Sequence, residues 1–129
     1  MSAPQRCPCG SGDDYDSCCG RFHGGEPAPT AEALMRSRFT AFAMGDAAYL
    51  TRTWHSAQRP RRLDLDPSLR WLRLDIVDIV AGGPFDTTGI VEFRAHHRSA
   101  DRRGVLHERS RFVRENGAWF YVDGTTPRT

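Results

Sequence analysis

Four cysteines near the start of the chain are the residues best suited to chemistry. They follow the order Cys7-x-Cys9, eight residues, then Cys18-Cys19. Gly10-Ser11-Gly12 lets the backbone bend back, so both pairs of thiolates can meet one ion. Four thiolates make a closed tetrahedral zinc site with no open position. The spacing therefore predicts one structural zinc ion per chain, with all four cysteines as its ligands.

Other interpretations of these cysteines remain open. Two disulfides are disfavoured because nothing in the sequence predicts export, and cytosolic thiols stay reduced. Four unconnected buried cysteines are disfavoured because the surrounding segment has no core to bury them. His23 could displace Cys19 as the fourth ligand. Arg6 and Arg21 lie where they could offset the negative charge of a tetrathiolate site.

Composition indicates a soluble globular protein. The chain has 129 residues, 39% of them hydrophobic and 26% charged, which suits one domain with a small appendage. No apolar run approaches the roughly 20 residues needed to cross a bilayer, and no signal peptide is evident. We therefore expect a cytoplasmic protein with no membrane partner. The net charge of only +2 excludes a strong global attraction to nucleic acid.

The chain divides into three segments. Residues 1–24 hold all four cysteines and show almost no apolar periodicity, which predicts a knuckle that needs a metal staple. Residues 25–29 have the composition of a linker, and residues 30–129 form the main domain. Because few apolar residues precede Thr30, we expect the knuckle to unfold without destabilising that domain.

The main domain begins with two predicted helices. Thr30 is a good N-cap for the first, and Gly45 ends it. Asp46 can cap the second, with Leu50 and Trp54 on one face. Four alternating strands follow, around 72–76, 91–97, 106–112 and 119–122, with turns at 82–84, 101–104 and 116–117. This order predicts an α+β fold, with helices packed on one face of a curved antiparallel sheet.

Two resemblances support this division. The run Cys7-Pro8-Cys9-Gly10-Ser11-Gly12, then Tyr15 and Cys18-Cys19-Gly20, closely resembles the SEC-C motif, best known from the zinc tail of the SecA translocation ATPase. That motif often has histidine as its last ligand and basic residues beside the tyrosine. Here Cys19 takes the place of the histidine, and the neighbours of the tyrosine are Asp13, Asp14 and Asp16.

The rest of the chain resembles the uncharacterised bacterial YchJ family. The resemblance rests on 27–42, on 45–55, and on the stretches 106–112 and 119–124. It implies that the main domain is a cone-shaped α+β fold like nuclear transport factor 2 and ketosteroid isomerase. The family has no established activity, so the resemblance implies a fold and leaves the function open.

Cone folds often enclose a pocket between sheet and helix. Glu108 shares a strand face with Leu106 and Phe112, which should point inward, so it is a candidate for acid–base chemistry. The alternative is that Glu108 pairs with Arg36 or Arg38 and locks the helix to the sheet.

His55 is a second catalytic candidate at the mouth of this pocket, although it could instead interact with a helix C-terminus. The side chains that we expect to line the pocket are Trp54, Trp71, Phe93, Ser110, Phe112 and Trp119. The sequence has neither a Gly-rich phosphate loop nor a nucleophile with a plausible triad. We therefore favour a binding or adaptor module that presents the zinc knuckle to a protein or nucleic acid. The alternative is a small-molecule binding protein or acid–base enzyme that uses the pocket.

Overall fold

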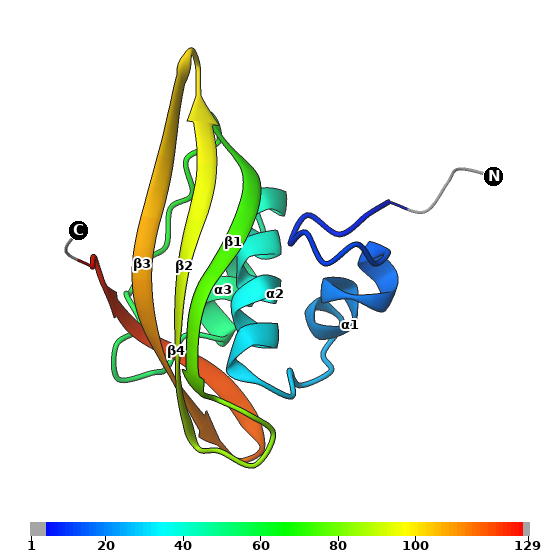
Figure 1. Cartoon of the computed structure of the whole chain (residues 1–129), viewed down its shortest axis with the longest axis vertical. Coiled ribbons are helices and arrows are strands. Elements are labelled where there is room, and N and C mark those ends of the chain that lie inside the picture. The colour runs from blue at the N-terminus through cyan, green and yellow to red at the C-terminus, as the bar shows by residue number, and fades with distance from the viewer. Residues whose placement is uncertain (1–4, 128–129) are drawn as a thin grey trace.

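The computed structural model describes residues 5–127. It confirms an α+β fold in which an N-terminal cysteine-rich segment and a few helices accompany a curved, four-stranded antiparallel sheet of order β1-β2-β3-β4 (Figure 1). The elements are η1 (Tyr15–Ser17), α1 (Cys19–His23), α2 (Ala31–Met44), α3 (Ala47–Arg52), β1 (Leu69–Ala81), β2 (Thr88–Ser99), β3 (Arg102–Glu115) and β4 (Ala118–Thr125). Among the described residues, no helix is long and apolar enough to cross a membrane.

The predicted ends of α2 and the start of α3 are confirmed. The hydroxyl of Thr30 accepts a hydrogen bond of 3.0 Å from the backbone N–H of Ala33. Gly45 ends α2 with a φ of 75°, a left-handed conformation that glycine adopts without a steric penalty. The carboxylate of Asp46 accepts a bond of 3.1 Å from the N–H of Tyr49. These caps are local chemistry, which is why the sequence predicts them.

The segment after α3 differs from the prediction. The helix ends at Arg52, so Trp54 does not lie on it. Trp54 instead forms an isolated parallel bridge with Tyr121 of β4. The backbone N–H of His55 donates to the carbonyl of Tyr121 at 2.7 Å. This bridge ties the end of the helical layer to an edge strand of the sheet.

The inner face of the sheet follows the predicted alternation in its central strands. Val91, Phe93 and Ala95 of β2 are all buried. In β1 the pairing with β2 shifts between Trp71 and Arg73, and this bulge leaves Leu72 47% exposed. The alternation predicted over 72–76 therefore fails at Leu72, because one extra residue moves a side chain to the other side of the sheet.

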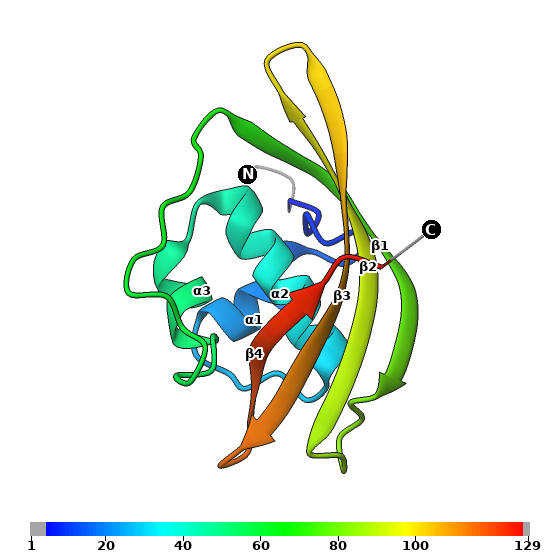
Figure 2. The same ribbon diagram turned by 90° about the vertical axis from the view of Figure 1, so that its left-hand side faces the viewer.

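The far end of the β2–β3 hairpin also departs from expectation. β2 ends at Ser99 and β3 begins at Arg102, so the turn is shorter than the predicted turn at 101–104. This end of the hairpin extends beyond the helices (Figure 2). Leu106, which pairs with Ala95 of β2, is 38% exposed, although the alternation predicted it to point into the core.

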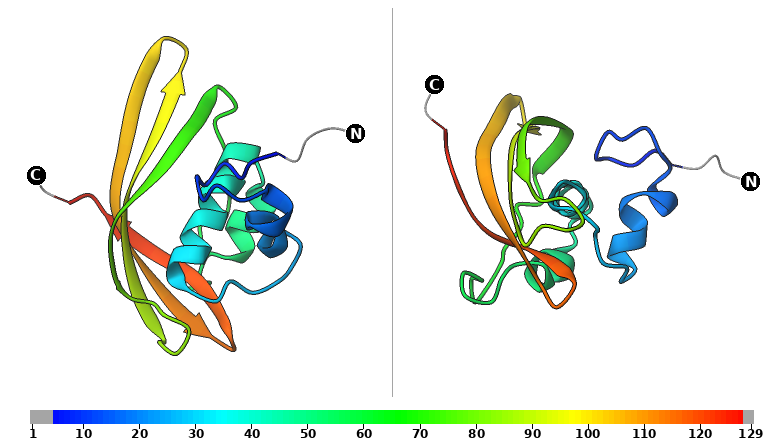
Figure 3. Two further views of the ribbon diagram at one scale, coloured as in Figure 1. Left: turned by 45° about the vertical axis from the view of Figure 1, so that its right-hand side comes forward. Right: turned by 60° about the horizontal axis from the view of Figure 1, so that its bottom comes forward.

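The knuckle packs on α2, on the side that faces away from the sheet (Figures 1 and 3). α2 is therefore covered on both sides. Its residues Ser37, Thr40 and Ala41 have no exposed surface, although they do not face the sheet. Phe22 of α1 is 5% exposed and belongs to the same hydrophobic cluster as the core of the main domain. Sheet, helix and knuckle thus form three layers.

These contacts lead us to expect that knuckle and main domain unfold together, in contrast to the independence predicted from the sequence. Phe22→Ala should lower the free energy of unfolding of the whole chain by about 3–5 kcal/mol, because it leaves a cavity in the shared core. Chemical denaturation followed by tryptophan fluorescence measures this change. Phe85→Ala is the control, since Phe85 is 95% exposed and its loss should have little effect. If Phe22→Ala does not change the denaturant concentration at the midpoint of the fluorescence transition, the two parts unfold separately.

Candidate functional site

The four cysteines meet at one point of the knuckle. Their sulfur atoms all lie within 4.8 Å of one another, and the Sγ atoms of Cys9 and Cys18 are 3.6 Å apart. Ligands at about 2.3 Å from one tetrahedral ion lie about 3.8 Å from each other, so the spacing suits a metal ion. All four thiols are free, and all but Cys18 are buried. The donor set therefore fits one metal ion bound by four thiolates.

The pKa values of these thiols depend on one another. Hydrogen bonding from Cys19 and Ser11 lowers the pKa of the Cys9 thiol to about 4 against the effect of its burial. The same bond with Cys9 raises the pKa of Cys19, and burial raises it further. Several thiolates cannot form together at this spacing unless a cation offsets their mutual repulsion. A metal ion supplies that charge and releases the remaining protons.

The helix α2 supplies the polar groups that surround the cluster. The hydroxyl of Thr40 donates to Sγ of Cys19 at 3.3 Å and lies 3.6 Å from Sγ of Cys7. The guanidinium of Arg36 donates to the carbonyl of Cys9 at 2.9 Å. Burial opposes the charge of Arg36, but its carboxylate partner Glu32 and the nearby Cys9 raise its pKa above the ordinary value. Such outer contacts orient ligands and tune their basicity.

Arg6 and Arg21, which we expected to offset the charge of the thiolates, are engaged elsewhere. Arg6 donates to the carbonyl of Gly12 at 2.8 Å. Arg21 lies 3.4 Å from the carboxylate of Glu26. Arg36 is the arginine that the structure places at the cluster. From the sequence, Arg36 was considered only as a candidate partner of Glu108.

His23 is not part of the sulfur cluster. Its Nε2 lies 2.9 Å from the carbonyl oxygen of Ser37, which can only accept, so Nε2 carries a proton. In the neutral ring Nδ1 then accepts from the hydroxyl of Tyr15 at 2.7 Å. Burial raises the pKa of Tyr15 and keeps that hydroxyl protonated. His23 thus links the knuckle to α2, and both of its nitrogens are occupied.

A cavity of about 200 Å³ lies between α2 and the inner face of the sheet. Aromatic and apolar side chains make up most of its wall, and several polar groups also line it. The lining residues are Met35, Arg38, Phe42, Trp54, Phe93, Glu108, Ser110 and Tyr121. Such a cavity has the composition of a small-ligand site.

Arg38 is the cation of this cavity and is only 3% exposed. Its Nη1 donates to the carbonyl of Leu50 at 2.8 Å and to the hydroxyl of Thr53 at 2.7 Å, both at the end of α3. The guanidinium carbon lies 4.6 Å from the ring centre of Tyr121 and 5.3 Å from that of Trp54. Burial lowers the pKa of Arg38 to about 10, so the group stays charged at neutral pH.

Glu108 points into the cavity, as the strand alternation predicted. Its Oε1 accepts hydrogen bonds from Ser110 at 2.8 Å and from Tyr121 at 3.0 Å. Burial and the nearby carboxylate raise the pKa of Tyr121, which therefore stays a donor. Within residues 5–127, no arginine nitrogen lies within 4.0 Å of Glu108. The alternative of an ion pair with Arg36 or Arg38 is therefore wrong.

The structure brings together only some of the other predicted site residues. Trp54, Phe93 and Ser110 line the cavity. The other three predicted residues do not line it. Trp71 packs on Phe39 and Phe42, and Phe112 and Trp119 are buried elsewhere in the core.

His55 lies outside the cavity. Its Nε2 is 3.0 Å from the carboxylate of Glu115, and its Nδ1 accepts from the backbone N–H of Ala57. The ring also packs edge-on against Phe120. His55 and Glu108 are therefore not brought together as an acid–base pair.

The sequence analysis missed three wall residues, Met35, Phe42 and Tyr121. Met35 and Phe42 share a face of α2 with Arg38, at a spacing of three to four residues that the sequence contains. Tyr121 pairs with Phe112 across the β3–β4 hairpin. Residues directly opposite each other in a hairpin share a face of the sheet. Because Phe112 was predicted to point inward, its partner Tyr121 could have been placed on the inner face as well.

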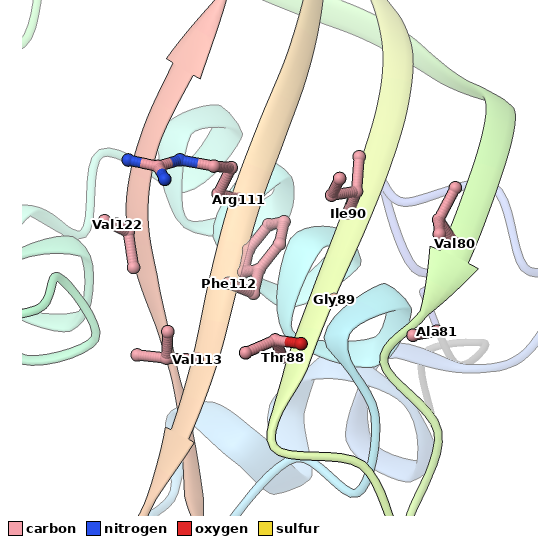
Figure 4. Close-up of a pocket in the computed structure, with 9 residues that line it drawn as sticks. All are labelled: Val80, Ala81, Thr88, Gly89, Ile90, Arg111, Phe112, Val113 and Val122. Carbon is pink, nitrogen blue, oxygen red and sulfur yellow. The ribbon is translucent and has the colours of Figure 1, made fainter.

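A second hollow, of about 230 Å³, lies over the sheet and is mostly apolar (Figure 4). Val80, Ile90 and Val122 contribute to its wall. Its charged member is Arg111, which donates twice to the carboxylate of Asp123. The charge of Arg111 is thus neutralised by a partner, which sets this hollow apart from the cavity at Arg38.

Glu108→Gln tests the assignment of Glu108 to the cavity. Glutamine keeps the acceptor that Ser110 and Tyr121 use, so the free energy of unfolding should change by less than about 1 kcal/mol. Loss of a buried ion pair would cost about 3–5 kcal/mol. Chemical denaturation of the variant distinguishes the two, with Asp101→Asn as a control on an exposed carboxylate. A loss in the larger range would contradict the geometry described above.

Comparisons with known proteins agree with this architecture. Residues 30–124 match the family described as YchJ, middle NTF2-like domain, and residues 4–21 match the SEC-C motif. A UPF0225 protein of Streptomyces coelicolor is 61% identical over 92% of this chain and 93% of its own length. A UPF0225 protein of Corynebacterium glutamicum is 54% identical over 93% of this chain and 96% of its own length.

Two solved structures share the fold. The solution structure of a SEC-C motif containing protein from Rhodopseudomonas palustris has a TM-score of 0.83 and 32% identity, and the match covers 96% of this chain and 100% of the other. A crystal structure of a SEC-C motif containing protein from Psychrobacter arcticus has a TM-score of 0.77 and 28% identity, with 97% and 84% covered. The chain therefore belongs to the YchJ (UPF0225) family, with an N-terminal SEC-C motif and a middle NTF2-like domain.

Proposed function

We propose that this chain is a binding protein whose architecture is fastened by one zinc ion, held by Cys7, Cys9, Cys18 and Cys19. The observation that carries the proposal is the cluster of four sulfur atoms within 4.8 Å of one another, packed against α2. Four thiolates in a tetrahedral arrangement select zinc over magnesium or calcium, which prefer oxygen. Because all four positions are filled by protein, the ion is structural and does not activate water.

The ion fixes the position of α2. Knuckle residues contact one side of the helix through Arg36, Ser37 and Thr40. The opposite side of the helix carries Arg38 into the cavity. Metal binding supplies the energy that orders the short knuckle, which has too small a core of its own.

The outer side of the knuckle is the surface that we propose for a protein partner. Asp13, Asp14 and Asp16 are exposed there, in the loop before η1 and in η1 itself, a segment that the proposed metal holds rigid. Their negative charge repels the phosphates of nucleic acid, whereas it complements a basic protein surface and speeds encounter with it. We therefore favour a protein over a nucleic acid as the partner.

Elemental analysis tests the metal. Protein purified without chelator should contain one zinc per chain, and Cys9→Ser should lower both the zinc content and the unfolding temperature of the whole chain. Ser17→Ala is the matched control, because Ser17 lies beside the cluster and its hydroxyl bonds only the carbonyl of Asp14. Protein without metal, or with two intact disulfides by mass spectrometry, would disprove the zinc site.

Affinity capture tests the partner. The double variant Asp13→Asn/Asp16→Asn should lose a protein that the unaltered chain captures from a lysate of a bacterium that carries a family member. Asp64→Asn/Asp101→Asn removes the same charge from exposed positions far from the knuckle in sequence and should retain that protein. If both variants capture the same proteins as the unaltered chain, the acidic loop is not the docking surface.

A further inference from the structure

The cavity between α2 and the sheet is built around a buried cation. Arg38 is 3% exposed, and no carboxylate oxygen of the described residues lies within 4.0 Å of it. The charge of Glu108 acts on Arg38 only from a greater distance. A buried guanidinium without an adjacent anion is costly. The fold therefore keeps a positive charge beside a hollow of about 200 Å³.

Hydrogen-bond donors around this hollow are left without acceptors. Both bonds that Arg38 makes to described residues use Nη1, which leaves Nε and Nη2 free of partners within residues 5–127. The indole Nε1 of Trp54, which also lines the cavity, is buried without a hydrogen-bond partner there. Guanidinium and indole nitrogens only donate. The corner formed by Arg38 and Trp54 therefore suits an anion.

The sheet side of the cavity offers an acceptor. Ser110 and Tyr121 both donate to Oε1 of Glu108, and Oε2 receives no hydrogen bond from any described residue. These two donors hold the carboxylate in place. A ligand that donates a hydrogen bond could use the remaining oxygen.

We propose that this cavity binds a small carboxylic acid that carries a hydroxyl or amino group next to its carboxylate. The carboxylate lies on the free edge of Arg38, and the neighbouring group donates to Glu108. Phe42, Phe93 and the ring of Tyr121 cover the carbon skeleton. One cation with a carboxylate nearby favours a monoanion over dianionic phosphate. This proposal goes beyond the function proposed above and requires no contact with the knuckle's exposed loop.

The test is a titration of the full chain at constant ionic strength, followed by the indole N–H signals in a ¹H–¹⁵N spectrum. Lactate, propionate and lactamide are the probes, and Trp54→Phe assigns the signal of Trp54. Lactate should shift that signal saturably and bind at least tenfold more tightly than lactamide, which lacks the charge. Trp119 is an internal control, because its Nε1 donates to the carbonyl of Pro29 and not into this cavity. Its signal should move little.

Two variants separate the two halves of the proposal. Arg38→Gln should weaken lactate and propionate alike by at least tenfold, while Arg94→Gln, which removes an exposed arginine of β2, should change neither. Glu108→Gln should reduce the preference for lactate over propionate and leave propionate binding intact or tighter. This second variant keeps the proposal testable if Arg38→Gln does not fold.

The outcomes that overturn the proposal are specific. The cavity is not an anion site if no carboxylate gives a saturable shift, or if lactamide binds as tightly as lactate. Inorganic phosphate that binds more tightly than lactate would assign the cavity to a different class of anion. Propionate equal to lactate in the unaltered chain would remove the role given to Glu108.

Discussion

Burial of α2 on two opposite sides is the constraint on which the rest of the structure depends. A helix that packs on one sheet normally keeps a polar, solvated outer side, but Ser37 and Thr40 on this side of α2 have no exposed surface. Polar groups buried in this way need partners. The carbonyl of Ser37 accepts from His23, and the hydroxyl of Thr40 donates to Cys19, so the knuckle supplies both. Without the knuckle, the outer side of α2 would be exposed to water. Its small side chains could not shield the core from solvent.

The cysteine cluster and the cavity both depend on this one helix. Arg36 and Arg38 stand two positions apart, which is about 200° around a helix of 3.6 residues per turn. Arg36 therefore faces the knuckle and bonds the carbonyl of Cys9, while Arg38 faces the sheet and bonds the end of α3. Arg36 thus holds the loop that carries Cys9, and Arg38 gives the cavity its positive charge. The same geometry explains why both cannot pair with Glu108.

The sequence predicted the features that depend on local chemistry. The caps at Thr30 and Asp46 follow from side chains that bond nearby backbone groups, and the inward direction of Glu108 follows from strand alternation. Features set by tertiary contacts were missed. The bulge that exposes Leu72 depends on pairing with β2, and the partners of Arg38 depend on where α3 ends. A signal for the docked knuckle was present in the small, uncharged residues Ser37, Thr40 and Ala41, which accompany Arg36 on the outer side of α2.

The three layers also imply that a metal ion bound by the four cysteines would be coupled to the cavity. Thr40 contacts the cluster and Arg38 lines the cavity, both from the same rigid helix of 14 residues. If loss of the metal releases the knuckle, α2 loses its outer contacts, and the distance between Arg38 and Glu108 is no longer fixed from both sides. A ligand that spans these two residues binds only the arrangement in which they are correctly spaced. Thermodynamic linkage then requires that the ligand tighten metal binding by the same factor by which the metal tightens ligand binding. Metal binding by the knuckle and ligand binding in the cavity would therefore be coupled through the position of α2.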